Sequence, residues 1–154
     1  MGVIEAIWLK RAHRGPMDPV ATATAVTGKG LAGDVTTSRR RQVTVIEREV
    51  WEAIMRELGA EASPAGRRAN LMVSGVSLYD TRGMVLRVGA VRLLIGGETT
   101  PCERMDEVVP GLRAAMKPRW GGGVFAQVLD DGAISVGDAV VLEEATASPS
   151  PATR

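Results

Sequence analysis

The chain has few of the residue types on which many binding and catalytic sites depend. Its 154 residues include one cysteine and one histidine, and only 3% are aromatic. One cysteine excludes an internal disulfide and suggests a reducing compartment. A structural zinc site normally takes four Cys or His ligands, so this composition argues against one. The scarcity of aromatic side chains argues against the stacking platforms that bind single-stranded nucleic acid.

Charge and apolar patterning are also unexceptional. The formal net charge is +1, so no strong overall field attracts nucleic acid or a membrane surface. No apolar run approaches the ~20 residues of a membrane-spanning helix, and the N-terminal residues lack the pattern of a signal peptide. We therefore expect a cytoplasmic protein with one domain over residues 1–144. Residues 145–154, rich in Ala, Ser, Thr and Pro, are predicted to be a disordered tail.

Short strands separated by turn residues dominate the rest of the chain. Strands are predicted over residues 3–10, 20–26, 42–46, 71–73, 84–88, 90–95, 124–129, 133–136 and 139–142, with a further short apolar segment over 76–78 and a loop over 13–19. The clearest helix is predicted over Glu47–Leu58, with Gly59 ending it, because its apolar residues recur on one face. A second, shorter helix is predicted over Gly111–Met116. The fold class is therefore mostly β with a few helices (α+β), with a largely antiparallel sheet that closes or folds into a barrel.

The stretch around the single cysteine predicts a helix start. Thr100 is suited to the N-cap, Pro101 to the first helical position, and Glu103 to the third position of a capping box. Cys102 would then lie in the first turn, where free N–H groups and the helix dipole lower a thiol pKa. The charge of Glu103 opposes this effect and that of Arg104 offsets it. The alternative is a small buried residue, but the polar flanks favour a reactive or metal-ligating thiol.

A second motif, Gly28–Gly33, matches G-x-G-x-x-G without the context of a dinucleotide site. That site needs a helix to start at the glycines, and residues 34–38 form a poor helix. The acidic residue about twenty positions further on would be Glu52, which lies in the predicted helix and not at a strand end. We therefore expect these glycines to serve a turn or a close approach of the backbone.

Three basic stretches are candidates for binding an anion. They are Arg39–Arg41, the run Arg67-Arg68-Ala69-Asn70 before a strand, and the glycine-rich loop Lys117–Gly123. Arginine offers a planar fork of donors for a phosphate, asparagine offers a donor and an acceptor, and glycine lets backbone N–H groups approach an anion. Each stretch has a plainer alternative, namely a solvated loop or a flexible connector, and the residues alone leave both open.

The order of these features resembles the MOSC domain family, named for the C-terminal domain of molybdenum cofactor sulfurase. The resemblance extends from about Val3 to Glu143. Its marks are Gly30-Leu31-Ala32-Gly33-Asp34, Arg41-Gln42-Val43-Thr44-Val45-Ile46-Glu47, Arg67-Arg68-Ala69-Asn70-Leu71, Cys102, and Gly132-Ala133-Ile134-Ser135-Val136-Gly137-Asp138-Ala139-Val140. Each mark alone is weak, but the set in this order is fairly specific.

The resemblance implies a closed β-barrel, a molybdenum cofactor and a site around the cysteine. Cys102 corresponds to the family cysteine that ligates molybdenum in amidoxime-reducing members and is thought to carry sulfur in others. Arg68 and Asn70 match an Arg-x-Asn element that holds the cofactor, and Thr100 matches a Ser/Thr position lining it. Arg67, Arg41 and Arg119 are further candidates for cofactor binding, because they belong to the basic stretches described above.

Three functions remain in competition at this point. Cys102 ligates molybdenum in an enzyme that reduces N-hydroxylated compounds, or it holds a persulfide as a sulfur carrier, or the chain is a non-catalytic binding module. The amidoxime-reducing members have a further N-terminal domain, and this sequence starts at the core. We therefore expect a separate partner, either an electron-transfer protein or a cysteine desulfurase-type protein, and we expect neither nucleic acid nor membrane as a partner.

Overall fold

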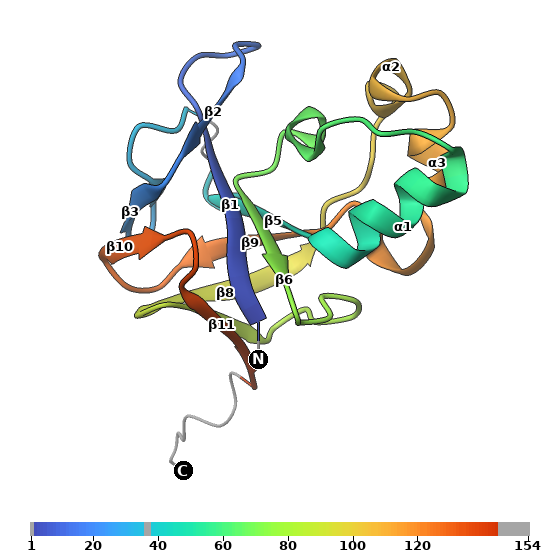
Figure 1. Cartoon of the computed structure of the whole chain (residues 1–154). Coiled ribbons are helices and arrows are strands. Elements are labelled where there is room, and N and C mark those ends of the chain that lie inside the picture. The colour runs from blue at the N-terminus through green and yellow to red at the C-terminus, as the bar shows by residue number, and fades with distance from the viewer. Residues whose placement is uncertain (1, 36–37, 145–154) are drawn as a thin grey trace.

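The computed structural model describes residues 2–35 and 38–144, and Figure 1 shows their arrangement. The predicted tail over 145–154 lies outside the described residues. The strands are β1 (Gly2–Lys10), β2 (Met17–Val20), β3 (Thr22–Val26), β4 (Gly30–Leu31), β5 (Val43–Glu47), β6 (Leu71–Ser74), β7 (Val85–Val88), β8 (Val91–Glu98), β9 (Val124–Val128), β10 (Gly132–Ser135) and β11 (Ala139–Glu143). The helices are α1 (Arg48–Leu58), α2 (Met105–Val108) and α3 (Leu112–Met116), with short 3-10 helices η1 (Pro64–Arg67) and η2 (Pro118–Trp120).

Within these described ranges, seven strands close into a barrel. The order is β11-β7-β8-β9-β5-β6-β1, and the start of β1 pairs with β11 to complete the ring. β5 and β6 run parallel, and the other neighbours are antiparallel. Closure removes exposed sheet edges from the barrel. The prediction of a mostly β, largely antiparallel closed barrel is confirmed.

The remaining strands lie outside the ring. β2 pairs with the far end of β1, from Ile7 to Lys10, and β10, β3 and β4 form a separate three-stranded sheet. β2 corrects the sequence prediction, which placed a loop over 13–19. Pro19 is accommodated because β2 pairs only with β1, so the missing N–H interrupts no second ladder.

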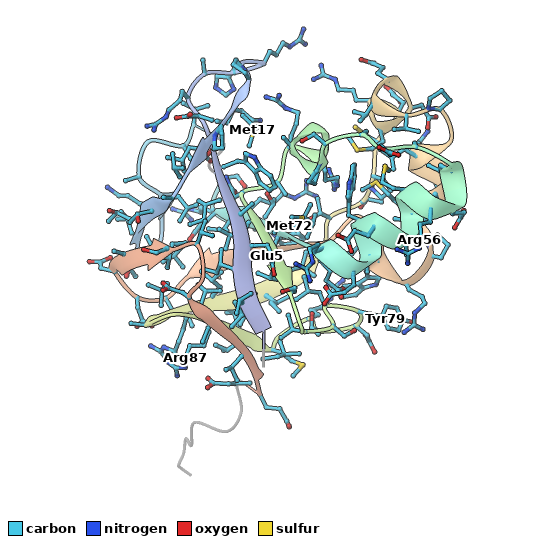
Figure 2. All side chains as sticks on the ribbon, in the orientation of Figure 1. Glu5, Met17, Arg56, Met72, Tyr79 and Arg87 are labelled. Atoms are coloured by element: carbon cyan, nitrogen blue, oxygen red, sulfur yellow. The ribbon has the colours of Figure 1, made fainter. Side chains whose placement is uncertain are left out.

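The barrel interior is an apolar core built by alternation along the strands. Residues of β8 alternate between buried and half-buried, and Val43 and Val45 of β5 are fully buried. Polar side chains extend outward, as Arg87 of β7 does in Figure 2. Its Nε pairs with the carboxylate of Glu143 on β11 at 3.1 Å.

The three helices gather on one side of the barrel (Figure 1). Their shared core consists of Trp51, Ile54, Met55, Met105, Val109, Leu112 and Met116. The helix predicted over Glu47–Leu58 is confirmed as α1, and Gly59 closes it in the left-handed conformation with φ 63°. The shorter predicted helix is confirmed as α3. No helix among the described residues is long and apolar enough to cross a membrane.

The short apolar segment over residues 76–78 is not a strand. Leu78 is fully buried, but its backbone N–H donates to the Glu47 carboxylate over 3.0 Å instead of to a neighbouring strand. The glycine motif behaves as expected, since β4 and a turn follow Gly28, with no helix in residues 28–35. At Gly30, where φ is 129°, a Cβ atom would lie 2.6 Å from the carbonyl oxygen of Gln42.

Candidate functional site

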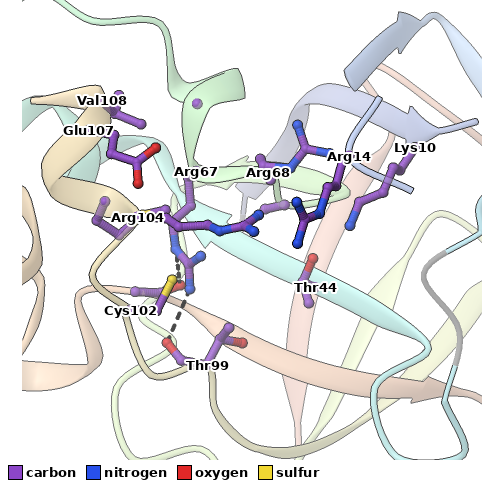
Figure 3. Close-up of a pocket in the computed structure, with 14 residues that line it drawn as sticks. Lys10, Arg14, Thr44, Arg67, Arg68, Thr99, Cys102, Arg104, Glu107 and Val108 are labelled. Carbon is purple, nitrogen blue, oxygen red and sulfur yellow. Dashed lines mark hydrogen bonds between the residues drawn. The ribbon is translucent and has the colours of Figure 1, made fainter. Parts of the chain in front are cut away.

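A cavity of about 510 Å³ opens beside Cys102, a size typical of ligand pockets. Residues from the end of β1, from η1 and the residues after it, and from the β8–α2 connection line it. Five of its side chains are cationic and one is a carboxylate: Lys10, Arg14, Arg67, Arg68, Arg104 and Glu107. Figure 3 shows them converging on the cavity from opposite sides. The lining therefore favours an anionic ligand.

Cys102 is a free, exposed cysteine in the cavity wall, but it is not in a helix. α2 begins at Met105, with Arg104 at its N-cap position and no side-chain cap hydrogen bond, so the predicted capping box of Thr100 and Glu103 is wrong. The backbone instead turns through i+3 hydrogen bonds, the first from Met105 N to Cys102 O at 3.0 Å. The argument from a helix dipole therefore does not apply to this thiol.

Arg67 fixes the wall on which Cys102 lies. Its buried guanidinium donates from Nε to the carbonyl oxygen of Gly122 over 3.1 Å and from Nη2 to that of Thr99 over 3.2 Å (Figure 3). Burial lowers the pKa of Arg67, and an electrostatic interaction with Cys102 opposes that change. The cation that interacts electrostatically with Cys102 therefore also joins η1, the β8–α2 connection and the glycine-rich loop.

Lys10 and Arg68 bring further positive charge to the same cavity. Arg68 adopts a left-handed backbone conformation with φ 64°, and its Nη2 donates to the carbonyl oxygen of Gly15 over 2.7 Å. The pKa of Lys10 is lowered, first by burial and then by the charge of Arg68, with Arg104 adding to the effect. Such mutual repulsion is relieved when an anion binds among the cations.

Asn70 has a different position from the one that the resemblance implies. It is 4% exposed and does not line the cavity. Its Oδ1 accepts a hydrogen bond from Thr44 N at 3.0 Å, and its Nδ2 donates to Trp8 O and to Asp34 Oδ1, both at 3.2 Å. Thr44 does line the cavity, so Asn70 contributes to the site by holding a wall residue in place.

The other predicted site residues are dispersed. Thr100 is exposed and outside the cavity lining. Arg41 is exposed and stacks on Phe125, with 5.2 Å between its guanidinium carbon and the ring centroid. Its charge also lowers the pKa of Arg67. Arg119 lines a separate hollow of about 310 Å³ and stacks on Tyr79 at 4.4 Å. The structure therefore brings together Cys102, Arg67 and Arg68 from the predicted set.

Sequence reasoning missed most of the remaining lining. Lys10 and Arg14 come from the first strand and the loop after it, and no local pattern connects them to Cys102. Thr99 and Gly122 also line the cavity. A Cβ at Gly122 would lie 2.4 Å from the Thr99 carbonyl oxygen, so this position requires glycine. Arg104 was visible beside the cysteine but was considered only for its charge.

This barrel with a cysteine-containing cationic cavity is of the MOSC type. The MOSC domain profile matches residues 32–141, which is most of the chain, so the chain belongs to the MOSC domain family. The resemblance seen in the sequence is thereby confirmed. No curated protein matches the chain in sequence.

Solved structures share the fold at low identity. The YuaD protein of Bacillus subtilis superposes with a TM-score of 0.79 and 21% identity, covering 94% of this chain and 97% of that one. YiiM of Geobacillus stearothermophilus gives a TM-score of 0.71 and 17% identity, covering 94% and 76%. YiiM of Escherichia coli gives 0.67 and 19%, covering 91% and 69%. At these identities the likeness concerns the fold.

Proposed function

We propose that this protein binds the molybdenum cofactor in the cationic cavity, with Cys102 as the metal ligand, and reduces N-hydroxylated compounds. The observation that carries the proposal is the exposed Cys102 thiol on the wall of a cavity lined by five cations and one carboxylate. Membership of the MOSC domain family supports the same cofactor.

The donor set fits a metal that arrives within an organic cofactor. In the described part of the chain, no three His, Cys, Asp or Glu side chains gather as ligands for a metal ion. Cys102 alone therefore suits a metal that brings its other ligands with it, and a thiolate is the soft donor expected for molybdenum. The cationic lining suits the phosphate of a pterin cofactor, because guanidinium groups bind phosphate through paired donors.

The residues of the chain would divide the work between holding and positioning. Arg68, Lys10 and Arg104 would hold the anionic part of the cofactor, and Arg67 would keep the wall fixed through its two backbone carbonyl partners. When bound, the cofactor supplies a two-electron redox centre. Reduction of an N-hydroxylated compound takes two electrons and two protons and yields the amine and water. The electrons would come from an electron-transfer partner.

A sulfur-carrier function is favoured by a separate observation, namely that the exposed Cys102 is the only cysteine in the sequence. A persulfide on Cys102 cannot be discharged as an internal disulfide and must pass to an acceptor. In that reaction the Cys102 thiolate attacks the terminal sulfur of a donor persulfide. A new S–S bond forms on Cys102, the donor S–S bond breaks, and the donor leaves as a thiolate. The donor would be a cysteine desulfurase-type protein.

Metal analysis and intact mass on protein from a molybdopterin-proficient host would test these functions together. Near-stoichiometric molybdenum that is lost in Cys102→Ala would support the oxidoreductase. A mass gain of one sulfur atom that a reductant removes, without metal, would support the carrier. Arg56→Gln is the matched control, because Arg56 is an exposed α1 residue outside the cavity lining. The absence of both metal and added sulfur would contradict both functions and leave a non-catalytic binding module.

A further inference from the structure

The hydroxyl of Thr99 is a buried polar group in the wall of the cavity. Within residues 2–35 and 38–144, its Oγ1 is buried and has no hydrogen-bond partner. Thr99 lines the same cavity as Cys102, and Figure 3 shows both at the guanidinium of Arg67. Buried hydroxyls nearly always have a partner, so this one calls for a group that enters the cavity.

The backbone of Thr99 is held from two sides. Its N–H donates to Gly123 O over 2.8 Å, and its carbonyl oxygen accepts from Arg67 Nη2 over 3.2 Å. The close approach of Gly122 to that carbonyl leaves little room for the backbone to shift. Threonine is also restricted at χ1. The backbone that carries the hydroxyl is therefore fixed in the cavity wall.

Neighbouring threonines do not offer an equivalent group. The Thr44 hydroxyl is engaged with Asn70, accepting from its backbone N–H over 3.1 Å and donating to Oδ1 over 3.4 Å. Thr100, the threonine singled out from the sequence, is exposed and outside the lining. Of the described residues that line the cavity, Thr99 thus presents the hydroxyl whose hydrogen-bonding capacity is not used by the protein.

We propose that Thr99 forms an oxyanion subsite beside Cys102, in which its hydroxyl donates a hydrogen bond to an anionic oxygen of the bound ligand. The positive field of Arg67 and of the other lining cations favours an oxyanion as the acceptor. The inference rests on the proposed function where the oxygen belongs to the cofactor, but the same chemistry would recognise a free oxyanion such as inorganic phosphate.

Three variants separate the hydroxyl from the shape of the side chain. Thr99→Val keeps nearly the same shape without the hydroxyl, Thr99→Ser keeps the hydroxyl, and Thr100→Val removes an exposed hydroxyl as the control. Unliganded Thr99→Val is expected to have a Tm equal to or above that of the wild type, because it loses a buried group without a partner. A much lower Tm would reveal an internal partner for the hydroxyl and overturn the proposal.

Titration of the unliganded proteins with inorganic phosphate, followed by calorimetry, is the direct test. Thr99→Val is expected to bind phosphate about tenfold more weakly than the wild type, as for loss of one hydrogen bond to a charged group. Thr99→Ser and Thr100→Val are expected to keep affinities close to the wild type. Equal phosphate affinity in Thr99→Val and the wild type, or no phosphate binding by the wild type, would overturn the subsite for a free oxyanion.

Molybdenum retention during dialysis separates this inference from the proposed function. If the wild type carries molybdenum and Thr99→Val loses it faster while Thr99→Ser does not, the subsite holds the cofactor. If both retain it equally, the subsite for the cofactor is overturned and the proposed function stands. If the wild type carries no molybdenum, the oxidoreductase proposal fails and the phosphate titration alone decides the subsite.

Discussion

Asn70 donates a hydrogen bond from Nδ2 to Oδ1 of Asp34 over 3.2 Å, and both side chains are buried. The same Asp34 oxygen accepts from the backbone N–H of Lys10 over 2.7 Å. Asp34 ends the glycine stretch of the sequence and Asn70 ends the arginine stretch, so two separate family marks meet at the end of β1. Since Lys10 and Thr44 both line the cavity, this buried network sets the geometry of the wall.

We predict that Asn70→Ala lowers stability more than it alters direct ligand contacts. The change would leave Thr44 N–H, Trp8 C=O and the Asp34 carboxylate each short of a hydrogen bond. Loss of such a buried network is expected to cost about 3 kcal/mol, or roughly 10 °C in Tm. Thermal and urea unfolding of the unliganded protein would measure this loss.

Thr100→Ala is the control for the Asn70 prediction, because Thr100 is an exposed residue near the cavity. Its stability is expected to remain within about 0.5 kcal/mol of the wild type. Wild-type stability in Asn70→Ala, together with a loss of cofactor, would instead support the direct cofactor contact that the sequence resemblance implies.

Gly122→Ala is expected to destabilise the cavity wall. The added Cβ would lie 2.4 Å from the Thr99 carbonyl oxygen and 3.2 Å from Arg67 Nη2, so backbone must move. Overpacking of this kind costs about 1–3 kcal/mol, which denaturant unfolding would measure. Gly132→Ala is a milder comparison, since its Cβ would meet only a Val91 methyl group at 3.1 Å. Equal stability of the two variants would contradict the crowding argument.

The cationic lining predicts that affinity for an anion depends on Arg68 and on salt. Arg68→Gln is expected to weaken phosphate binding about tenfold, because a charge-assisted contact is lost. The wild-type affinity is expected to fall as ionic strength rises. Calorimetry at two salt concentrations would measure both effects. Arg56→Gln, an exposed change outside the lining, should behave like the wild type. An equal loss in both variants would indicate a general charge effect.

The parts of this fold that depend on local pattern were predictable from the sequence. The apolar face of α1 and its closing glycine are local signals, and both were placed correctly. The prediction of a helix start at Cys102 was wrong, because a capping-box pattern reflects only the local sequence. In the structure the chain there turns through i+3 hydrogen bonds, and the distant Arg67 fixes the carbonyl of Thr99.

The candidate site was harder to predict because it is assembled by barrel closure. Cys102 and Arg68 were identified through residue chemistry and family resemblance, and they do line one cavity. Lys10 enters that cavity because β1 pairs with β6, a contact between distant segments that leaves no local signal. The sequence favoured Thr100 over Thr99, because the contacts of the Thr99 backbone with Gly123 and Arg67, which hold Thr99 in the cavity wall, join distant segments of the chain.

The half-buried carboxylate of Glu47 gives a pH-dependent prediction. Burial raises the pKa of Glu47 above 4.5, its ordinary value, although the backbone N–H of Leu78 donates to it and partly opposes this effect. The folded state thus binds the proton more tightly than the unfolded state. The resulting stability is fully present below the unfolded pKa and is lost as the pH rises through the folded pKa.

Replacing Glu47 with glutamine keeps an acceptor for Leu78 N–H and removes the buried charge. Glu47→Gln is therefore expected to have a higher Tm than the wild type at pH 7, and the difference is expected to shrink as the pH falls toward 4. Thermal unfolding across this pH range would measure the difference in Tm. Glu57→Gln, which changes an exposed residue of α1, is the control. A lower Tm of Glu47→Gln at pH 7 would mean that attraction to Arg119, which also favours the ionised carboxylate, outweighs burial.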